Sequence, residues 1–512
     1  MRVLMVAAEN DRLPQCKVGG VADVIRDIPY ALAKHRVETL VVVPDYGQSG
    51  LSRKFVGDIA VPFRQHLETA TLWEVEHTDG VIQYVISHSL FSEHGGAIYC
   101  NDDDQRPFAT DATKFAFFSA AVGEAIEHDL FGHLDVLHLH DWHAACVAVL
   151  KEFSPRFIKL KELRTVYTVH NLALQGIRPF NHDDSSLEAW FPTLSYDGQV
   201  LCDHQYPHCF NPMRSAITLS DKVHVVSPNY AEEVLRSSEP DRGFFGGEGL
   251  EHDMQIAKRY GKLIGILNGC EYSQNDVAAS DLQQFLNASE RMLLIWMAKS
   301  RQLTSSHYIA HKRVTSWLNT PSSGPLVTSV GRLTDQKALL LRQTTDAGII
   351  LDDLAKITAQ NSGRLVVLGS GDAHLEHVFT QAMARNDNLL FLNGYGQALG
   401  DMLYDIGDLF LMPSSFEPCG ISQMLAMRSG QPCLVHQVGG LSDTVEHLKS
   451  GFTFSGEDLP QQKTALVSTF SQAIQLYGDN SERYSQLRDC AREKRFEWDS
   501  VALSYINSLY IN

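Results

Sequence analysis

The sequence predicts an α/β protein built from two doubly wound domains. At 512 residues the chain exceeds one ordinary hydrophobic core. Apolar runs of strand length alternate with helical patterns along almost all of it, which is typical of parallel sheets with right-handed crossovers. A polar, glycine-rich stretch at 237–249 interrupts this alternation. We therefore expect one domain at 1–260, a second at 261–488, and a helical tail at 489–512 that packs back on the first.

The expected elements follow from the apolar runs and the helical spacing between them. In the first domain we expect strands at 3–7, 38–43, 136–139, 165–169 and 223–226, and helices at 21–34, 113–127 and 144–153. In the second domain we expect strands at 263–267, 326–330, 365–368, 389–392, 409–412 and 433–435. The tail from about residue 482 has a helical pattern.

Composition excludes several classes of protein. The net charge of −18 argues against nucleic acid and anionic membranes as partners. No segment reaches the ~18 consecutive apolar residues that a membrane-spanning helix needs. The 9 cysteines show no paired spacing, which argues against a disulfide framework or a structural zinc site. No basic leader or apolar signal core precedes the first expected strand, so we expect a reduced, cytoplasmic protein.

A glycine loop follows the first expected strand. Gly19 and Gly20 would let the backbone approach a ligand closely, the next helix would point its N-terminus at the same place, and Lys17 would add a positive charge. The alternative is a tight turn that ends a solvated loop. The loop is not a dinucleotide fingerprint, since no GxGxxG follows the strand.

Two segments in the second half carry charged residues just after buried strands. The first contains Arg332 and Lys337, and the second contains Glu417 ahead of Gly420 and a helix start. Ligands of open α/β sheets bind outside the carboxyl ends of the strands. The two segments together therefore predict a site for a phosphorylated, sugar-like ligand.

Nine segments, in order along the chain, resemble motifs of bacterial glycogen synthases and plant starch synthases. They are 17–24 (KVGGVADV), 140–145 (HDWHAA), 166–176 (VYTVHNLALQG), 226–231 (VSPNYA), 267–269 (LNG), 332–337 (RLTDQK), 413–423 (PSSFEPCGISQ), 439–445 (GGLSDTV) and 496–510 (FEW…Y…LY). Many related retaining glycosyltransferases carry a second Glu eight residues after the first. Here that position is Leu425, and glycogen and starch synthases also lack this second Glu.

The resemblance implies the GT-B fold, in which two Rossmann-like domains face an interdomain cleft. It implies a metal-independent enzyme that moves glucose from ADP-glucose to the non-reducing end of an α-1,4-glucan, with retention of the α-configuration. The partners would be a nucleotide sugar and an α-glucan, with no further cofactor. UDP-glucose, another acceptor, and a non-catalytic glucan-binding relative remain as alternatives, and the oligomeric state is open.

The resemblance also implies residue roles. The matching Arg and Lys neutralise the departing diphosphate, the matching Glu faces the sugar hydroxyls, and the matching Tyr stacks on the base. The residues that carry catalysis would be Lys17, His170, Arg332, Lys337 and Glu417. The residues that bind substrate would be Gly19, Gly20, Asp23, Asp141, Asn171, Asn268, Tyr395, Cys419, Gly420, Ile421 and Ser422.

Structural alternatives stand beside these roles. Glu417 and Asp141 could each be a helix N-cap, Tyr395 an ordinary half-buried tyrosine, and His170 a satisfied structural residue. The alternating His138, His140 and His143 lack the carboxylate or cysteine spacing that would complete a metal site.

One stretch departs from the family pattern. At 270–321 the chain lacks the family's Trp-x-Pro segment, and Cys270 and Glu271 follow Gly269 where the family has Ile or Val and then Asp. We expect this stretch to affect the acceptor path and the nucleotide preference rather than the catalytic groups.

Overall fold

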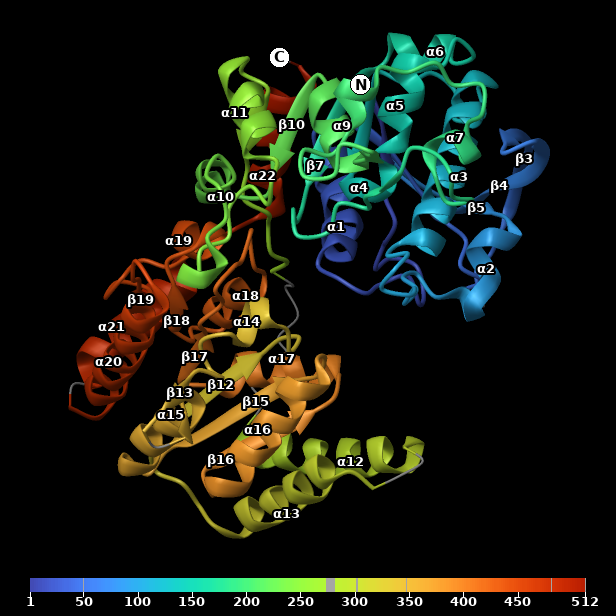
Figure 1. The fold of residues 1–512 in the computed structure, drawn as a ribbon. Coiled ribbons are helices and arrows are strands. Elements are labelled where there is room, and N and C mark those ends of the chain that lie inside the picture. The colour runs from blue at the N-terminus through green and yellow to red at the C-terminus, as the bar shows by residue number, and fades with distance from the viewer. Residues whose placement is uncertain (49, 273–280, 301–302, 347, 480, 512) are drawn as a thin grey trace. The chain divides into compact units, whose positions relative to one another are not determined.

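A computed structural model describes residues 1–48, 50–272, 281–300, 303–346, 348–479 and 481–511. The chain forms two compact units, each of them α/β (Figure 1). Unit 1 comprises residues 1–238, 246–271 and 497–512, and unit 2 comprises residues 239–245 and 272–496. The chain therefore passes between the units at several places rather than at one linker.

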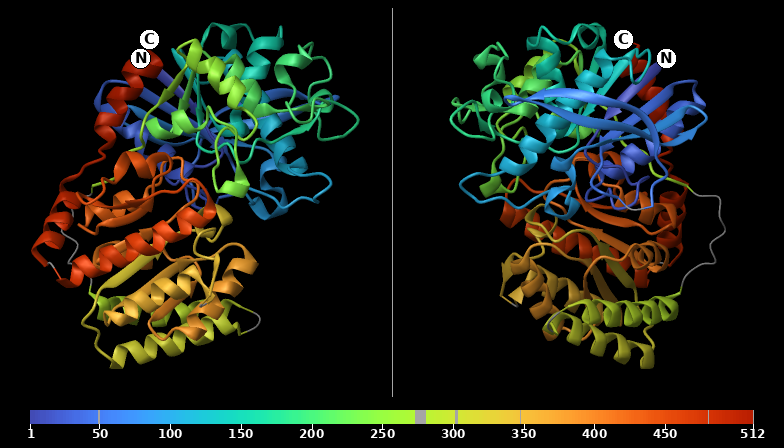
Figure 2. Two further views of the ribbon diagram at one scale, coloured as in Figure 1. Left: turned by 60° about the vertical axis from the view of Figure 1, so that its left-hand side comes forward. Right: turned by 90° about the vertical axis from the view of Figure 1, so that its right-hand side faces the viewer.

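Unit 1 is built on a nine-stranded sheet with the order β11-β10-β7-β6-β1-β2-β5-β4-β3. Its strands are β1 (Arg2–Val6), β2 (Glu38–Pro44), β3 (Lys54–Phe63), β4 (His66–Thr78), β5 (Val81–Ser87), β6 (Val136–His140), β7 (Arg164–Val169), β10 (Lys222–Val225) and β11 (Leu263–Gly265). From β11 to β5 all neighbours are parallel. Strands β3 and β4 form an antiparallel ribbon at one edge, visible in Figure 2.

Helices and one short antiparallel strand pair complete unit 1. The pair is β8 (Arg178–Pro179) with β9 (Cys209–Phe210). The helices are α1 (Val21–Lys34), α2 (Ser89–Gly96), α3 (Ala109–Glu127), α4 (Asp141–Ala144), α5 (Cys146–Phe153), α6 (Ile158–Glu162), α7 (Leu187–Trp190), α8 (Gly198–Leu201), α9 (Pro212–Leu219), α10 (Pro228–Glu233), α11 (Glu251–Arg259) and α22 (Trp498–Tyr505), with a π-helical turn η2 (Ile506–Tyr510). Helix α1 has Gly20 as its N-cap and buries Val24, Ile25, Ile28 and Leu32, which lie on one face at helical spacing.

Unit 2 is built on a six-stranded parallel sheet with the order β16-β15-β12-β17-β18-β19. Its strands are β12 (Leu326–Val330), β15 (Arg364–Gly369), β16 (Leu389–Asn393), β17 (Leu409–Met412), β18 (Cys433–His436) and β19 (Gly451–Phe454), and a separate hairpin pairs β13 (Thr344–Thr345) with β14 (Gly348–Ile349). Its helices are η1 (Pro240–Arg242), α12 (Leu282–Lys299), α13 (Ser305–Asn319), α14 (Asp335–Ala338), α15 (Ile350–Gln360), α16 (Ala373–Arg385), α17 (Gln397–Ile406), α18 (Ser422–Arg428), α19 (Gly439–Thr444), α20 (Leu459–Asp479) and α21 (Ser481–Glu493).

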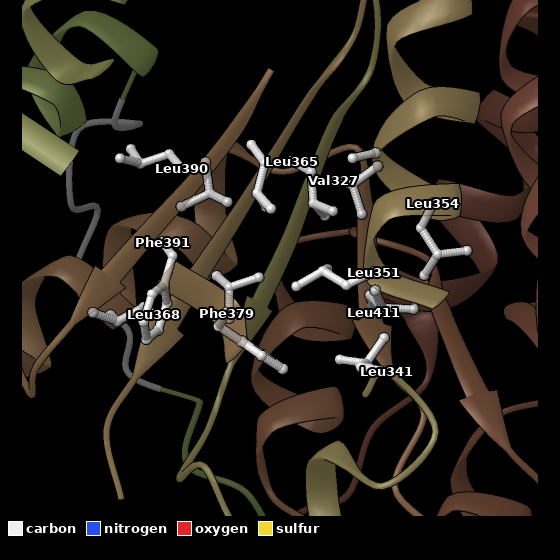
Figure 3. Packing of buried hydrophobic residues seen from close by; sticks show 14 of the residues in the cluster. Val327, Leu341, Leu351, Leu354, Leu365, Leu368, Phe379, Leu390, Phe391 and Leu411 are labelled. Carbon is white, nitrogen blue, oxygen red and sulfur yellow. The ribbon is translucent and has the colours of Figure 1, made fainter. Parts of the chain in front are cut away.

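The core of unit 2 forms on the central strands. Val327 and Leu365 pair across β12 and β15 and lie side by side in Figure 3. Both are fully buried, as are Leu390 on β16 and Leu411 on β17. Continuous apolar runs of this kind are typical of parallel strands covered on both faces. The exposed positions that remain for polar chemistry lie where these strands end.

Three expectations about the sheets and boundaries are wrong. The strand expected to open the second domain, β11, pairs parallel with β10 and so belongs to the sheet of unit 1. The stretch 237–249 is not a single boundary, because residues 239–245 join unit 2 and the chain then returns to unit 1. The sheet of unit 1 is not parallel throughout, since β4 runs antiparallel to both β3 and β5.

The expected boundaries after residues 260 and 488 differ from those of the units, which change at Glu271 and Phe496. The end of the chain returns to unit 1. There Trp498 donates its indole N–H to Asp27 of α1 at 3.1 Å, and His35 lies 3.0 Å from Asp499. Within the described residues no helix is both long and apolar enough to cross a membrane.

The contact between Gly269 and Trp498 allows a test of this return. A Cβ on Gly269 would lie 2.5 Å from the Trp498 ring and 2.9 Å from its backbone nitrogen. We predict that Gly269→Ala lowers the free energy of unfolding by about 2 kcal/mol, as overpacking against backbone does. Urea denaturation followed by circular dichroism measures it. The control Gly198→Ala, whose Cβ would meet only Tyr196 at 3.9 Å, should change stability by less than about 0.5 kcal/mol. Equal effects of the two substitutions would contradict this account of the packing.

Candidate active site

In unit 1 the loop after β1 is held by a buried carboxylate. Glu9 accepts hydrogen bonds from the backbone N–H groups of Val18 and Gly19, the second at 2.7 Å, and from the Tyr99 hydroxyl at 2.5 Å. Glu9 is 2% exposed. A Cβ on Gly19 would lie 3.5 Å from Oε1 of Glu9 and one on Gly20 would meet nothing within 4 Å. The glycine loop is therefore an ordered turn fixed by a carboxylate, and Val18 and Gly20 within it are exposed.

The side chain of Lys17 extends from this loop and binds two carboxylates. Its Nζ lies 2.6 Å from Asp23 and 3.1 Å from Asp11, and Arg26 also contacts both carboxylates. Burial by itself would lower the pKa of Lys17, but hydrogen bonds and charge from Asp23 and Asp11 raise it overall. Lys17 is therefore cationic at neutral pH, and Asp23 binds Lys17 in the structure.

Asp141 follows β6 and supports the turn after β7. Its backbone has a φ of 54°, and its carboxylate accepts the backbone N–H of His170 at 2.7 Å. Burial raises the pKa of Asp141 to about 7, although the N–H groups of His170 and Asn171 oppose the shift. The N-cap of α4 is His140, so the expectation that Asp141 caps this helix is wrong.

His170 lies beside this carboxylate with its ring 3.0 Å from another histidine. The contact joins Nε2 of His170 to Nδ1 of His140. Burial lowers the pKa of His170 to about 3, so its imidazole is neutral. Asn171 uses its side-chain oxygen to accept the N–H of Ala173 at 2.8 Å. Asn268, beyond β11, is 4% exposed, and its Oδ1 has no hydrogen-bond partner among the described residues.

In unit 2 Arg332 stands on the turn after β12. Its side chain is exposed, and within the described residues its guanidinium has no hydrogen-bond or ion-pair partner. Two glycines bring a neighbouring loop against this turn. A Cβ on Gly369 would lie 1.9 Å from the carbonyl oxygen of Gly331, and one on Gly371 would lie 2.3 Å from that of Leu333. The backbone under Arg332 is thus fixed, while its charge remains available.

Lys337 and Glu417 form an ion pair next to this turn. The Nζ of Lys337 lies 2.6 Å from Oε2 of Glu417, and the hydroxyl of Ser414 donates to the same oxygen at 3.2 Å. Glu417 is 7% exposed. Gln336 also joins the two loops, donating its side-chain amide to the Phe416 carbonyl at 2.9 Å. The loops after β12 and β17 are therefore locked together at the point where their charges meet.

Glu417 does not cap helix α18. The N-cap of that helix is Ile421, and no side chain caps it in the described part of the chain, so the first N–H groups of the helix are open to another acceptor. Gly420 has a φ of +75°. A Cβ on Gly439, which has a φ of +43°, would lie 2.0 Å from the Glu417 carbonyl oxygen. Only glycine at position 439 lets α19 approach this loop.

The remaining expected positions in unit 2 take different environments. Tyr395 follows β16 and is 72% exposed, so the expectation of a half-buried tyrosine is wrong. Cys419 is buried, and the hydroxyl of Ser422 accepts a hydrogen bond from the Tyr404 hydroxyl at 3.1 Å. A small cavity of about 30 Å³, lined by Arg332, Lys337, Ser414 and apolar core residues, lies under the two loops.

The structure thus gathers the expected residues into two groups, one in each unit. In unit 1 they follow β1, β6, β7 and β11, and in unit 2 they follow β12, β16 and β17. Both groups stand at carboxyl ends of parallel strands, where open α/β sheets bind ligands. In the described residues no three His, Cys, Asp or Glu side chains are grouped so that they could hold a metal ion.

Sequence reasoning assigned no role to several residues of these groups. Tyr99 and Glu9 meet across a long loop, and Ser414 and Gly439 support Glu417 from separate segments. The motif 439–445 contained the signal for Gly439, since a paired glycine after a strand indicates a close backbone approach. The divergent stretch 270–321 contributes α12 and α13, which pack near β16 (Figure 1), and its residues 273–280 and 301–302 lie outside the described part.

Comparisons with known proteins match nearly the whole chain. Residues 2–256 match the starch synthase catalytic domain, and residues 324–472 match glycosyl transferases group 1. A glycogen synthase of Streptococcus gordonii is 31% identical over 99% of this chain and 98% of its own length. A glycogen synthase of Streptococcus agalactiae is 32% identical over the same shares.

A solved structure matches with a TM-score of 0.75 and 26% identity, over 99% of this chain and 98% of that one. It is the catalytic domain of starch synthase IV from Arabidopsis thaliana bound to ADP and acarbose. The fold class expected from the sequence, α/β of the GT-B type, is confirmed by this match, and the motif resemblance is confirmed by the relatives.

The raised pKa of Asp141 predicts a pH-dependent cost. The folded protein binds this proton more tightly than the unfolded chain, so stability from this group is complete below pH ~4 and is lost as pH rises through about 7. Asp141→Asn cannot ionise. Its stability relative to the unchanged protein should therefore improve by about 2 kcal/mol between pH 5 and pH 8, measured by urea unfolding at both values.

The control is Asp135→Asn. The N–H of Arg2 lowers the pKa of Asp135, so that carboxyl is ionised in folded and unfolded chains alike from pH 5 to pH 8, and its variant should show no such improvement. If the stability of Asp141→Asn relative to the unchanged protein did not change with pH, the prediction would be wrong, because Asp141 would then ionise at no cost in folding free energy.

Proposed function

The chain belongs to the glycogen and starch synthase family of glucosyltransferases, and from that premise we propose that it transfers glucose from ADP-glucose to the non-reducing end of an α-1,4-glucan with retention and without a metal ion. In this reaction the bond from glucose C1 to the diphosphate oxygen breaks, C1 bonds to the oxygen of the terminal glucan hydroxyl, and the proton of that hydroxyl passes to the departing diphosphate. Negative charge grows on the diphosphate as positive charge grows on the sugar ring. The site must stabilise both.

The observation that carries the proposal is the meeting of Arg332, Lys337 and Glu417 at two strand ends. The Arg332 guanidinium, which has no partner among the described residues, can bind two phosphate oxygens at once. The ammonium of Lys337 has three donors, and among the described residues it bonds only Glu417, which leaves capacity for a phosphate oxygen. Fixed cations of this kind stabilise a departing anion without a metal.

Glu417 suits the sugar side of the reaction. The carboxylate is held by Lys337 and Ser414 through one oxygen, Oε2. The other oxygen can accept a sugar hydroxyl, and its charge would balance positive charge that develops at the ring. The N–H groups at Ile421 and Ser422, on the uncapped end of α18, would donate to the diphosphate, with Cys419 and Gly420 shaping the turn that leads to them.

We propose that the unit 1 residues bind sugar hydroxyls of the donor and the glucan. Lys17, with Gly19, Gly20 and Asp23, forms a charged and ordered loop. Asp141 and His170 lie on adjacent turns beside Asn171. The buried Oδ1 of Asn268, which has no partner in the described part of the chain, could accept such a hydroxyl.

Donor choice is proposed as ADP-glucose. The support is the relative of known structure, which was solved with ADP and acarbose, together with the exposed ring of Tyr395, which offers a face for a base. A non-catalytic glucan-binding protein is the other candidate. Such a protein would have no need for the charged groups of the proposed site. All four of these groups are present: Lys17, Arg332, Lys337 and Glu417.

The test of the donor is an incubation of the purified protein with glycogen and radiolabelled ADP-glucose or UDP-glucose, in parallel. We predict that label enters the polymer from ADP-glucose and is released by an enzyme specific for α-1,4 bonds. Incorporation from UDP-glucose alone would reject the donor assignment. No incorporation from either, with nucleotide still bound, would reject the transfer reaction with glycogen as acceptor.

The test of the site is substitution of its two paired charges. We predict that Lys337→Ala and Glu417→Gln each lower kcat by about 100-fold or more, as loss of one stabilising group at a reacting centre does. The melting temperature and circular dichroism spectrum should stay close to those of the unchanged protein. Lys449→Ala removes a lysine from an exposed surface pair with Glu446 and should keep normal activity. Near-normal rates in both site variants would refute the assignment.

A further inference from the structure

Four buried histidines lie close together in unit 1. His138 and His140 are on β6, His224 is on β10, and His170 follows β7. Their exposed fractions are 0%, 1%, 0% and 8%. Burial lowers the pKa of all four imidazoles, to about 4 for His224 and about 3 for His170. Each ring is therefore neutral and carries one N–H, whose position its partners decide.

A chain of hydrogen bonds fixes two of these protons. The carbonyl of Ile266 can only accept, so Nε2 of His224, 3.2 Å away, carries the proton. Nδ1 of His224 then accepts the Thr168 hydroxyl at 2.9 Å, and the Thr168 oxygen accepts Nε2–H of His138 at 2.7 Å. Nδ1 of His138 is left to accept the Tyr510 hydroxyl at 2.8 Å. Only this assignment of donors and acceptors satisfies all the groups of the chain.

His140 and His170 share a separate hydrogen bond of 3.0 Å between Nδ1 of His140 and Nε2 of His170. One of these nitrogens donates. The other nitrogen of His140, Nε2, is buried and has no partner among the described residues, and the ring of His138 stacks on that of His140 with centroids 4.3 Å apart. If His170 donated, His140 would have to carry its proton on Nε2 as a buried N–H with no acceptor.

Orphaned buried N–H groups are rare in folded proteins, and unpaired acceptors are less so. The favoured arrangement has the His140 proton on Nδ1, pointing at His170. Nε2 of His170 then accepts, and its own proton lies on Nδ1. This nitrogen has no hydrogen-bond partner in the described part of the chain. It is also not fully enclosed by protein, so a ligand can reach it.

We propose that His140 is a positioning residue, which holds His170 in the tautomer that presents an Nδ1–H donor to the substrate. The acceptor would be an oxygen of the sugar, a hydroxyl or a ring-linked oxygen. The identity of this acceptor rests on the proposed function, whereas the tautomer does not. His140 itself touches no substrate, and its effect passes through the hydrogen bond to His170.

The test is the tautomer of His170, read from its two ring ¹⁵N shifts and long-range ¹H–¹⁵N couplings in protein labelled at histidine. The His170 signals are those that disappear in His170→Gln. We expect the unchanged protein to show protonated Nδ1 and unprotonated Nε2. A protonated Nε2 would overturn the proposal, whatever the activity of the protein.

Two substitutions separate positioning from packing. His140→Phe removes the donor and leaves an aromatic face, which can accept a weak N–H···π contact, so the His170 proton should shift toward Nε2. His140→Asn, whose amide can donate from nearly the same place as Nδ1, should restore the Nδ1–H form. The control His143→Phe replaces a buried ring that packs against Tyr99 and Phe115. Among the described residues His143 makes no hydrogen bond to His170, so this variant should leave the tautomer unchanged. A tautomer identical in all variants would overturn the positioning role.

Activity gives a second readout. With ADP-glucose and glycogen, His140→Phe should lower kcat/KM by about 10-fold, the value of one hydrogen bond to substrate, and His140→Asn should recover most of it. If His140→Phe does not fold, the spectrum of the unchanged protein and that of His140→Asn still decide the tautomer. If the protein transfers no glucose at all, the proposed function fails, while the NMR result stands by itself.

Discussion

Parallel strands of one sheet all end at the same edge, and in both units this constraint places the chemistry. The strands are apolar on both faces, so their sides cannot carry exposed charge. Charged and polar side chains appear where the strands stop, on the turns that hold Arg332 and Glu417 in unit 2 and Asp141 and His170 in unit 1. Residues far apart in the sequence become neighbours because their strands are neighbours.

The loops that hold these side chains are fixed by contacts of a different kind. In unit 2, glycine carries much of the geometry, because a Cβ on Gly369 or Gly439 would overlap a backbone oxygen. In unit 1, buried carboxylates fix the loops. Glu9 and Asp141 each accept backbone N–H groups of a neighbouring turn, and the cost of burying such a group appears in the raised pKa of Asp141.

The sequence predicted those helices and strands that are determined by the residues within them. Strands β12 and β17 and helix α1 lie at the expected residues, since continuous apolar runs and helical spacing determine them. The placement of β11 could not be predicted, because a three-residue strand of intermediate burial is assigned to a sheet only by its pairing with β10. The β3–β4 ribbon was missed because its exposed, alternating residues do not form the apolar runs used to find parallel strands. The motifs brought Lys337 and Glu417 to attention, but not the support from Ser414, nor the pairing of His140 with His170, both of which depend on contacts between separate segments.

The central claim is that the strand-end residues of unit 2 bind the diphosphate of the donor. A crystal structure of the protein with ADP tests it most directly. The account predicts phosphate oxygens within hydrogen-bond distance of the Arg332 guanidinium and the Lys337 ammonium, with the first N–H groups of α18 directed at the same diphosphate. ADP bound elsewhere on the chain, with Lys337 still paired to Glu417 and no phosphate near Arg332, would contradict it.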